Sequence, residues 1–87
     1  MGYEVRLRRS AQKELDALPE QDYEKVAKVI GTLEENPRPP RVKKLADSAL
    51  WRIRVGQYRV VYAVDDEAQS VTIVRVARHK EDTYEGR

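Results

Sequence analysis

Hydrophobic and polar residues alternate in three parts of the chain, which is the pattern of strands with one buried face. The first is short and lies near the start, at Tyr3, Val5 and Leu7. The second is residues 50–64, LWRIRVGQYRVVYAV, which reads as two strands around a tight turn. The third runs from Val71 to about Arg78. We therefore expect four strands, with a polar loop at 65–69.

Helical spacing of apolar residues appears only between the first and second of these parts. Ser10 is suited to cap a helix whose apolar side would be Ala11, Leu15 and Leu18. Pro19 then interrupts the helix and favours the first turn of another. A second stripe, at about 20–35, is made by Tyr23, Val26, Ala27, Ile30 and Leu33, and Asn36-Pro37 should end it. These residues predict a helical hairpin.

The turn Gly56-Gln57 sets the register of the central hairpin. A two-residue turn with glycine first would place Val55 opposite Tyr58 and Arg54 opposite Arg59. One face would then be apolar, with Trp51, Ile53, Val55, Tyr58, Val60, Tyr62 and Val64. We call the other the arginine face; on the hairpin it would carry Arg52, Arg54, Arg59, Val61 and Ala63.

The last strand extends both faces. Val74 and Val76 suit the core, which would put Arg75, Ala77 and His79 on the arginine face and add Ile73 to its apolar floor. The resulting order is β-α-α-β-β-β. We predict an α+β fold for residues 1–87 as a single domain, with an antiparallel sheet and an N-terminal helical hairpin packed on one face.

Composition argues against several classes of protein, namely disulfide-rich, metal-binding, membrane-spanning and secreted ones. The 87 residues include no cysteine and one histidine, which speaks against a disulfide framework or a metal site. The apolar runs are far shorter than a membrane span, which needs about 20 residues. The start lacks the apolar core of a signal peptide, so we expect a cytoplasmic protein without a membrane partner.

Charge is concentrated in one segment. Residues 38–59 hold seven basic residues against one acidic residue, Asp47, a net charge of +6 in a chain whose total is +2. Such a segment suggests an anionic partner. A solvated loop and hairpin would account for the composition equally well.

The facing pair Arg54 and Arg59 favours the functional alternative. Like charges directly opposite in a sheet destabilise it by a few tenths to about 1 kcal/mol, although salt screening would let an exposed pair persist. The cost is understandable if an anion lies between the guanidinium groups, because their geometry matches phosphate oxygens. Arg52 lies diagonally nearby, and Arg75 could join from the next strand.

Four stretches of the chain occur in the order seen in the RelE/ParE superfamily of toxins from bacterial toxin–antitoxin modules: SAQKELDALPE, NPRPPRVKKL, LWRIRVGQYRVVYAVDDE and VARHKEDTY. The chain resembles this family over nearly its whole length. The resemblance implies a microbial-RNase-like sheet and, for the RelE-like branch, cleavage of mRNA in the ribosomal A site. In that reaction the ribose 2′-OH attacks the adjacent phosphate, without a metal or cofactor.

The resemblance also implies roles for individual residues. Arg59 would stabilise the transition state, Arg54 would neutralise phosphate, and Tyr84 would stack on a base. The family has lysines where this chain has Arg52 and Arg54, and arginine cannot accept a proton. His79 is therefore the candidate acid or base, with Lys80 and Tyr84 as alternatives. The remaining candidate RNA-binding residues are Arg52, Arg41, Lys43, Lys44, Arg75 and Arg78.

Partners and alternatives follow from the same resemblance. A toxin of this type would pair with an antitoxin from a neighbouring gene and would act on the ribosome and its mRNA. The ParE branch shares the fold but inhibits DNA gyrase. A relative without catalytic activity that only binds RNA or its antitoxin is the third possibility.

Overall fold

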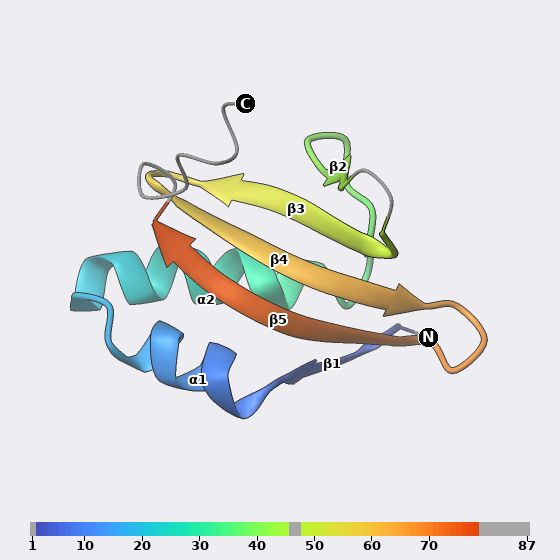
Figure 1. Cartoon of the computed structure of the whole chain (residues 1–87), viewed down its shortest axis with the longest axis horizontal. Coiled ribbons are helices and arrows are strands. Elements are labelled where there is room, and N and C mark those ends of the chain that lie inside the picture. The colour runs from blue at the N-terminus through green and yellow to red at the C-terminus, as the bar shows by residue number, and fades with distance from the viewer. Residues whose placement is uncertain (1, 46–47, 79–87) are drawn as a thin grey trace.

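The computed structural model describes residues 2–45 and 48–78, and its fold has two helices on a five-stranded sheet. The strands lie in the order β1-β5-β4-β3-β2 (Figure 1). The elements are β1 (Glu4–Leu7), α1 (Arg9–Asp16), α2 (Glu20–Thr32), β2 (Lys43–Lys44), β3 (Leu50–Val55), β4 (Tyr58–Asp65) and β5 (Ser70–Arg78). The predicted α+β class is confirmed. None of the helices described is long and apolar enough to cross a membrane.

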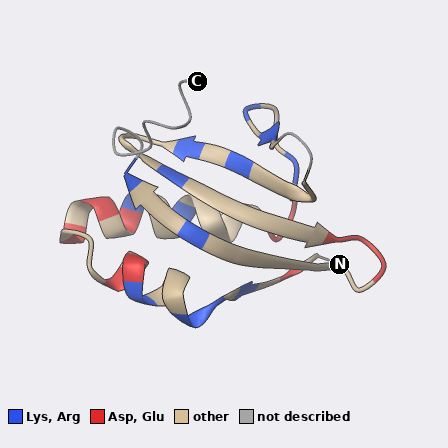
Figure 2. Cartoon of the chain, viewed as in Figure 1, with Lys and Arg blue, Asp and Glu red and all other residues tan. Residues whose placement is uncertain are grey.

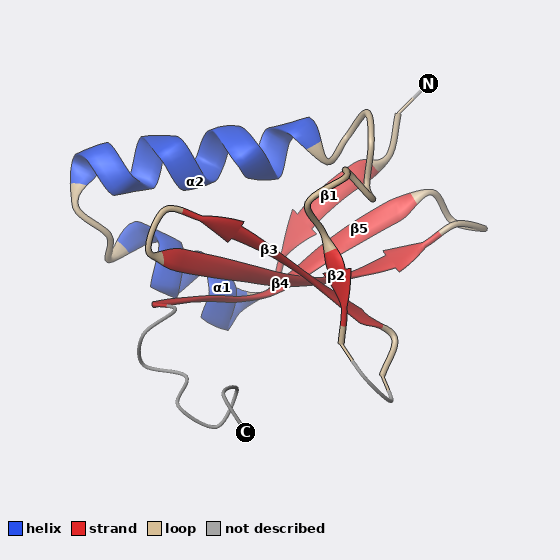
Figure 3. Cartoon of the chain, turned by 90° about the horizontal axis from the view of Figure 1, so that it is seen from above, coloured by secondary structure: helices blue, strands red, loops and turns tan. Residues whose placement is uncertain are grey.

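Residues of both helices pack on the apolar face of the sheet, and the view from above shows α2 lying along that face (Figure 3). The core lies between the helices and the sheet. Leu15 of α1 and Val26 and Ile30 of α2 pack against the apolar side of β3, β4 and β5. Val60 and Tyr62 in the central strand β4 are fully buried. Trp51 and Val64, predicted on the same face, are only partly buried and pack at the margin of this core.

The register of the β3–β4 hairpin is confirmed. Val55 pairs with Tyr58, Arg54 with Arg59 and Trp51 with Tyr62. Gly56 has φ of 60° at the first turn position, where a side chain would be strained. Because facing residues of an antiparallel pair lie on the same side of the sheet, this turn places the arginines together.

Two features of the sheet differ from the prediction. β1 pairs with β5 in parallel, so the sheet is mixed rather than antiparallel throughout. The helical hairpin follows β1 and carries the chain across the sheet to β2 and β3, and β3 and β5 then run in the same direction as β1 because both are antiparallel to β4. A two-residue strand that was not predicted, β2, also pairs with β3 at the opposite edge; it lies in the proline-rich segment 37–49 between α2 and β3, which we call the connector.

The sides of the sheet predicted for the first residues of β5 were wrong, because the strand contains a β-bulge. Val61 pairs with Arg75 but Tyr62 pairs with Ile73, so Val74 is an extra residue in β5. The residues of β5 that precede Val74 therefore point to the opposite side of the sheet from the side that was predicted. Ile73 is therefore fully buried in the core rather than part of the floor of the arginine face, and Val74 is only half-buried.

The N-cap of the first helix, the end of the second helix and one core residue were predicted wrongly, whereas the start of the second helix after Pro19 was predicted correctly. Arg8, not Ser10, is the N-cap of α1, because β1 runs almost directly into the helix and the Arg8 N–H bonds to the Ile73 carbonyl. α2 ends at Thr32, and three bonds of the shorter i to i+3 type follow it, donated by the N–H groups of Leu33, Glu34 and Glu35. Tyr23 is 38% exposed, at the edge of the apolar stripe rather than within the core.

Candidate nucleic-acid interface

Strands β3, β4 and β5 build the first row of the arginine face. Arg54 on β3 faces Arg59 on β4, which in turn faces Ala77 on β5. Arg59 is flanked by a strand on each side and is only 4% exposed, whereas Arg54 is exposed at the surface. An arginine buried to this degree has a restricted guanidinium, and side chains held on strands suit the positioning of a ligand.

A second row crosses the sheet beside the first. Lys43 on β2 faces Arg52 on β3, and Arg52 faces Val61 on β4. Together with Arg41 and Arg54, the two basic residues of this row line a pocket of about 150 Å³, which we call the basic pocket: Arg41, Lys43, Arg52 and Arg54. Basic side chains from the connector and from β3 thus meet in one hollow.

Three of the basic side chains that line the pocket have no acidic partner among the described residues. Within residues 2–45 and 48–78, no carboxylate lies in ion-pair range of Arg41, Lys43 or Arg54. Figure 2 shows basic segments side by side on β3 and β4, whereas acidic residues gather on the helices and on the β4–β5 loop. A cluster of this kind attracts an anion and can bind it through charge-assisted hydrogen bonds.

Arg75 was predicted to join this cluster, and its contacts are different. It faces Val61, in the second row, but its Nε lies 3.3 Å from Oε2 of Glu14 on α1. Glu14 also accepts a hydrogen bond of 2.7 Å from the Val76 N–H through Oε1. β1 ends opposite Ile73, so the carboxylate of Glu14 covers the edge of β5 where no strand continues and engages Arg75 there.

Lys44 and Arg78 lie on the other side of the sheet. Lys44 faces Trp51 and Arg78 faces Tyr58, and both of these aromatic residues belong to the apolar face. The Lys44 ammonium is 5.9 Å from the centroid of the Trp51 ring. The structure therefore separates these two candidate RNA-binding residues from the basic pocket. His79, Lys80 and Tyr84 lie outside the described residues.

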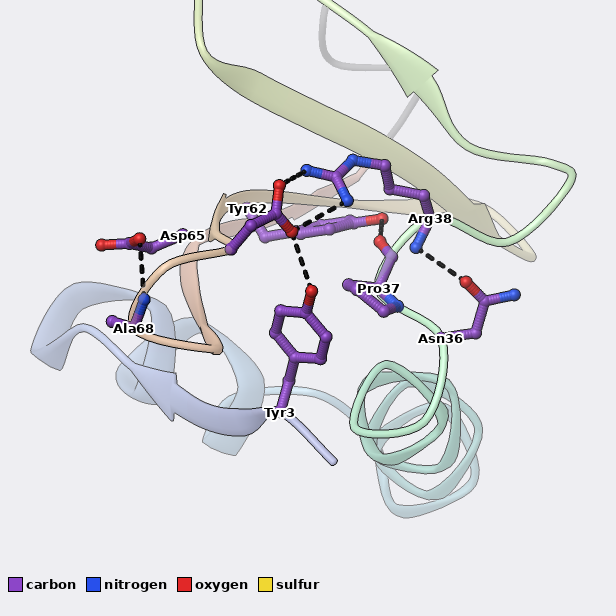
Figure 4. A network of polar contacts seen from close by, with 8 residues as sticks. Tyr3, Asn36, Pro37, Arg38, Tyr62, Asp65 and Ala68 are labelled. Carbon is purple, nitrogen blue, oxygen red and sulfur yellow. Dashed lines mark hydrogen bonds and ion pairs between the residues drawn. The ribbon is translucent and has the colours of Figure 1, made fainter. Parts of the chain in front are cut away.

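A polar network that the sequence did not indicate adjoins the connector (Figure 4). Arg38 donates two hydrogen bonds to the Asp66 carboxylate, at 3.2 and 2.8 Å, and the Tyr3 hydroxyl donates a third at 2.8 Å. The Arg38 guanidinium also stacks 5.2 Å from the centroid of the Trp51 ring. The Tyr62 hydroxyl donates to the Pro37 carbonyl at 2.7 Å. Only the opposite charges of two distant loops could have suggested this network.

The network shifts the pKa values of its members. Hydrogen bonds from Arg38 and then from Tyr3 lower the pKa of Asp66, because they stabilise its charged form. The same contact with Asp66 raises the pKa of the Tyr3 phenol. Burial raises the pKa of Tyr62 to about 12, since its anion would be poorly solvated. All three groups keep their ordinary protonation states at neutral pH.

Comparison with known proteins places this fold among toxins. The sequence model of a family described as ParE toxin of type II toxin-antitoxin system, parDE, matches residues 5–83. A protein of Methanocaldococcus jannaschii named “Putative toxin RelE1” is 32% identical over 90 residues, covering 97% of each chain.

Solved structures agree with the sequence comparisons. The RelE–RelB complex of Pyrococcus horikoshii contains a chain with a TM-score of 0.81 and 29% identity, covering 91% of this chain and 97% of that one. The RelBE2 toxin–antitoxin complex of Mycobacterium tuberculosis gives a TM-score of 0.80 and 31% identity, covering 90% and 99%. A mutant of Escherichia coli toxin RelE in the free state gives 0.80 and 25%, covering 99% and 93%.

Proposed function

This chain belongs to the RelE/ParE family of toxins from type II toxin–antitoxin systems, and from that premise we propose that it is a ribosome-dependent endoribonuclease. Its substrate is mRNA in the ribosomal A site, and its product is a truncated message that stops translation. The reaction uses the ribose 2′-OH as nucleophile and needs no metal or cofactor. The proposal is about the reaction and its target; membership of the family is its starting point.

The observation that carries this proposal is the register that sets Arg54 opposite Arg59, beside the basic pocket. A phosphodiester is a small anion with two free oxygens, which guanidinium groups can bind in a planar, bidentate manner. The exposed side chains of Arg41, Lys43 and Arg54 surround the pocket and can follow an RNA backbone beyond one phosphate. Val61, which faces Arg52 across the β3–β4 pair, places a buried apolar side chain in the same row as these cations.

Arg59 has the role of transition-state stabiliser. When the 2′-oxygen bonds to phosphorus, the phosphoryl oxygens gain charge, and a pre-positioned guanidinium stabilises that charge. The P–O5′ bond then breaks, leaving a 2′,3′-cyclic phosphate and a 5′-OH. Because arginine cannot serve as a base, removal of the 2′-OH proton and protonation of the 5′-oxygen are assigned to His79, with Lys80 and Tyr84 as alternatives.

An antitoxin is the second partner in this proposal. Among the structural relatives, the chains from P. horikoshii and M. tuberculosis were solved in toxin–antitoxin complexes. We expect the cognate antitoxin to come from a neighbouring gene and to mask the basic pocket with acidic residues. Such an interface would inhibit the toxin because antitoxin and RNA would compete for the same positive charge.

The test is cleavage of a defined mRNA on purified ribosomes, with the new 5′ ends mapped by primer extension. Cuts confined to the A-site codon are expected with the wild-type protein. Arg54→Gln should slow them at least tenfold. Arg6→Gln is the matched control, because Arg6 is an exposed strand arginine at the far edge of the same sheet, paired with Glu4. Absence of A-site cuts by a folded wild-type protein would refute the proposal.

A second candidate function should be tested beside mRNA cleavage, because the matching family model is described as ParE toxin. A ParE-like protein would inhibit DNA gyrase and leave mRNA intact. Loss of supercoiling by purified gyrase, without cleaved message, would establish this alternative. Ribosome binding with a steep salt dependence but without either activity would instead indicate a non-catalytic RNA-binding relative.

A further inference from the structure

The connector between α2 and β3 brings Arg41 and Lys43 to the basic pocket, but few contacts of its own hold it there. Among its described residues, its ladder is the two-residue pairing of β2 with β3, extended by one bond from the Leu45 N–H to the Leu50 carbonyl. Nearer to α2 its backbone makes a local turn bond from the Val42 N–H to the Pro39 carbonyl. A loop with so short a ladder needs a further anchor if its side chains are to keep fixed positions.

Arg38 supplies that anchor. Both terminal nitrogens of its guanidinium bond to the two oxygens of Asp66, so the pair is bidentate and has one defined orientation. The Tyr3 hydroxyl fixes the Asp66 carboxylate from the other side. The connector is thereby tied to the β4–β5 loop and, through Tyr3, to the segment that leads into β1.

Two further contacts complete the attachment. The guanidinium of Arg38 stacks on Trp51, the residue that faces Lys44 in the β2–β3 ladder. The Pro37 carbonyl, next to Arg38 in the chain, accepts the hydrogen bond from buried Tyr62. These contacts lie only a few residues before Arg41 and Lys43, so they set where the connector enters the basic pocket.

We propose that Arg38 and Asp66 are positioning residues: their ion pair fixes the connector so that Arg41 and Lys43 hold the RNA backbone at the basic pocket. This inference rests on the proposed function for its ligand. Arg38 does not itself bind RNA, because Asp66 neutralises its charge and it stacks on Trp51, which belongs to the apolar face rather than the arginine face.

The Arg38–Asp66 ion pair should matter more for RNA binding than for the stability of the fold, which distinguishes a positioning role from a purely structural one. Exposed ion pairs contribute little to global stability, and Arg38 and Asp66 have exposed side-chain fractions of 36% and 57%. Breaking the pair should therefore change the melting temperature slightly. Its effect on RNA binding should be larger, because side chains that are no longer pre-positioned must be ordered during binding.

The first experiment is a double-mutant cycle on the full chain with a fluorescein-labelled single-stranded RNA as probe. Asp66→Asn alone should raise Kd about three- to tenfold, the cost of ordering one or two side chains. In the background of Arg41→Gln and Lys43→Gln, the same substitution should have almost no further effect, because the residues through which it acts are gone. An unchanged Kd in Asp66→Asn, or a loss that simply adds in the triple variant, would overturn the proposal.

A second measurement needs no RNA and separates this inference from the proposed function. Trypsin should cleave after Arg41 and Lys43 faster in Asp66→Asn than in the wild type, under conditions where both are folded. Glu4→Gln is the control, since it removes the carboxylate of another exposed ion pair, with Arg6. Equal cleavage rates would overturn the anchoring, whatever the RNA result. Faster cleavage with no RNA binding by the wild type would refute the proposed function and the RNA role, and leave only the anchor.

Discussion

Arg75 and Arg54 lie on the same face of one sheet, yet their charges are met in different ways. The guanidinium of Arg75 is paired with Glu14, and that of Arg38, at the other end of the sheet, is paired with Asp66. Arg54 instead faces Arg59, and no carboxylate among residues 2–45 and 48–78 pairs with it. The comparison teaches that the fold supplies carboxylates to Arg75 and Arg38 and that, among the described residues, it supplies none to Arg54.

The different surroundings of Arg54 and Arg75 are better explained by ligand binding than by the stability of the sheet. Pairing two arginines across a hairpin is mildly unfavourable, and a carboxylate beside Arg54 would relieve it. A carboxylate in the pocket would, however, repel the phosphate that the site is proposed to bind. We therefore interpret Arg75 and Arg38 as structural and Arg54 as functional, and the predictions below test that division.

The largest expected effect is on the rate of mRNA cleavage in Arg59→Gln. Loss of a donor to the transition state should reduce the single-turnover rate on ribosomes about 10²- to 10³-fold. Arg75→Gln should reduce it less than threefold. Because Arg59 is 4% exposed, circular dichroism and a melting curve must show that the variant is folded. A folded Arg59→Gln protein that cleaves at the wild-type rate would remove Arg59 from the mechanism.

The next effect is on the salt dependence of RNA binding. Each phosphate contact to single-stranded RNA contributes about −0.7 to the slope of log K against log salt. Arg41→Gln should therefore make the slope shallower by about that amount, whereas Arg6→Gln should leave it unchanged. Titrations of a labelled single-stranded RNA at several salt concentrations measure both slopes. If the two variants were indistinguishable, the pocket would have no special part in binding.

A smaller effect, on RNA affinity, should follow when the ion pair between Glu14 and Arg75 is removed. Glu14→Gln keeps an oxygen that can accept the Val76 N–H but removes the negative charge opposite Arg75. We expect RNA affinity to rise about twofold, as one more cation becomes available at the edge of the arginine face. In an Arg75→Gln background the gain should vanish. A gain that persists there would mean that Glu14 acts through the general field of the protein.

The smallest effect concerns acid stability. The pKa of Asp66 in the folded protein is lowered by Arg38 and Tyr3, so its stabilising contribution is present above the ordinary aspartate pKa of about 4. It is lost as the pH falls through the folded-state pKa. The difference in melting temperature between wild type and Asp66→Asn should therefore narrow from about pH 6 to about pH 3. A difference that widens over this range would contradict the assigned shift.

Local rules predicted the hairpin because they act at short range. Gly56-Gln57 determines the turn, the turn determines the register, and the register brings Arg54 and Arg59 together. The same reasoning failed on β5, where a bulge at Val74 reversed the alternation and moved Ile73 into the core. A bulge is an adjustment between two strands, so the sequence of one strand gives little warning of it.

Contacts between distant segments could not be foreseen. The pairing of Glu14 with Arg75 joins residues 61 positions apart, and that of Arg38 with Asp66 joins two loops 28 positions apart. The composition of the connector indicated a basic segment. The path of the connector beside β3 determines which of its cations meet at the pocket.

The most direct test of the central claim is an NMR titration that follows the arginine side-chain Nε–Hε signals as single-stranded RNA is added. The signals of Arg52, Arg54 and Arg59 should shift in a saturable manner and at one common affinity, and those of Arg38 and Arg75 should stay in place. Shifts at Arg38 and Arg75 without shifts at Arg54 and Arg59 would contradict the assignment of the arginine face as the site that binds the phosphodiester.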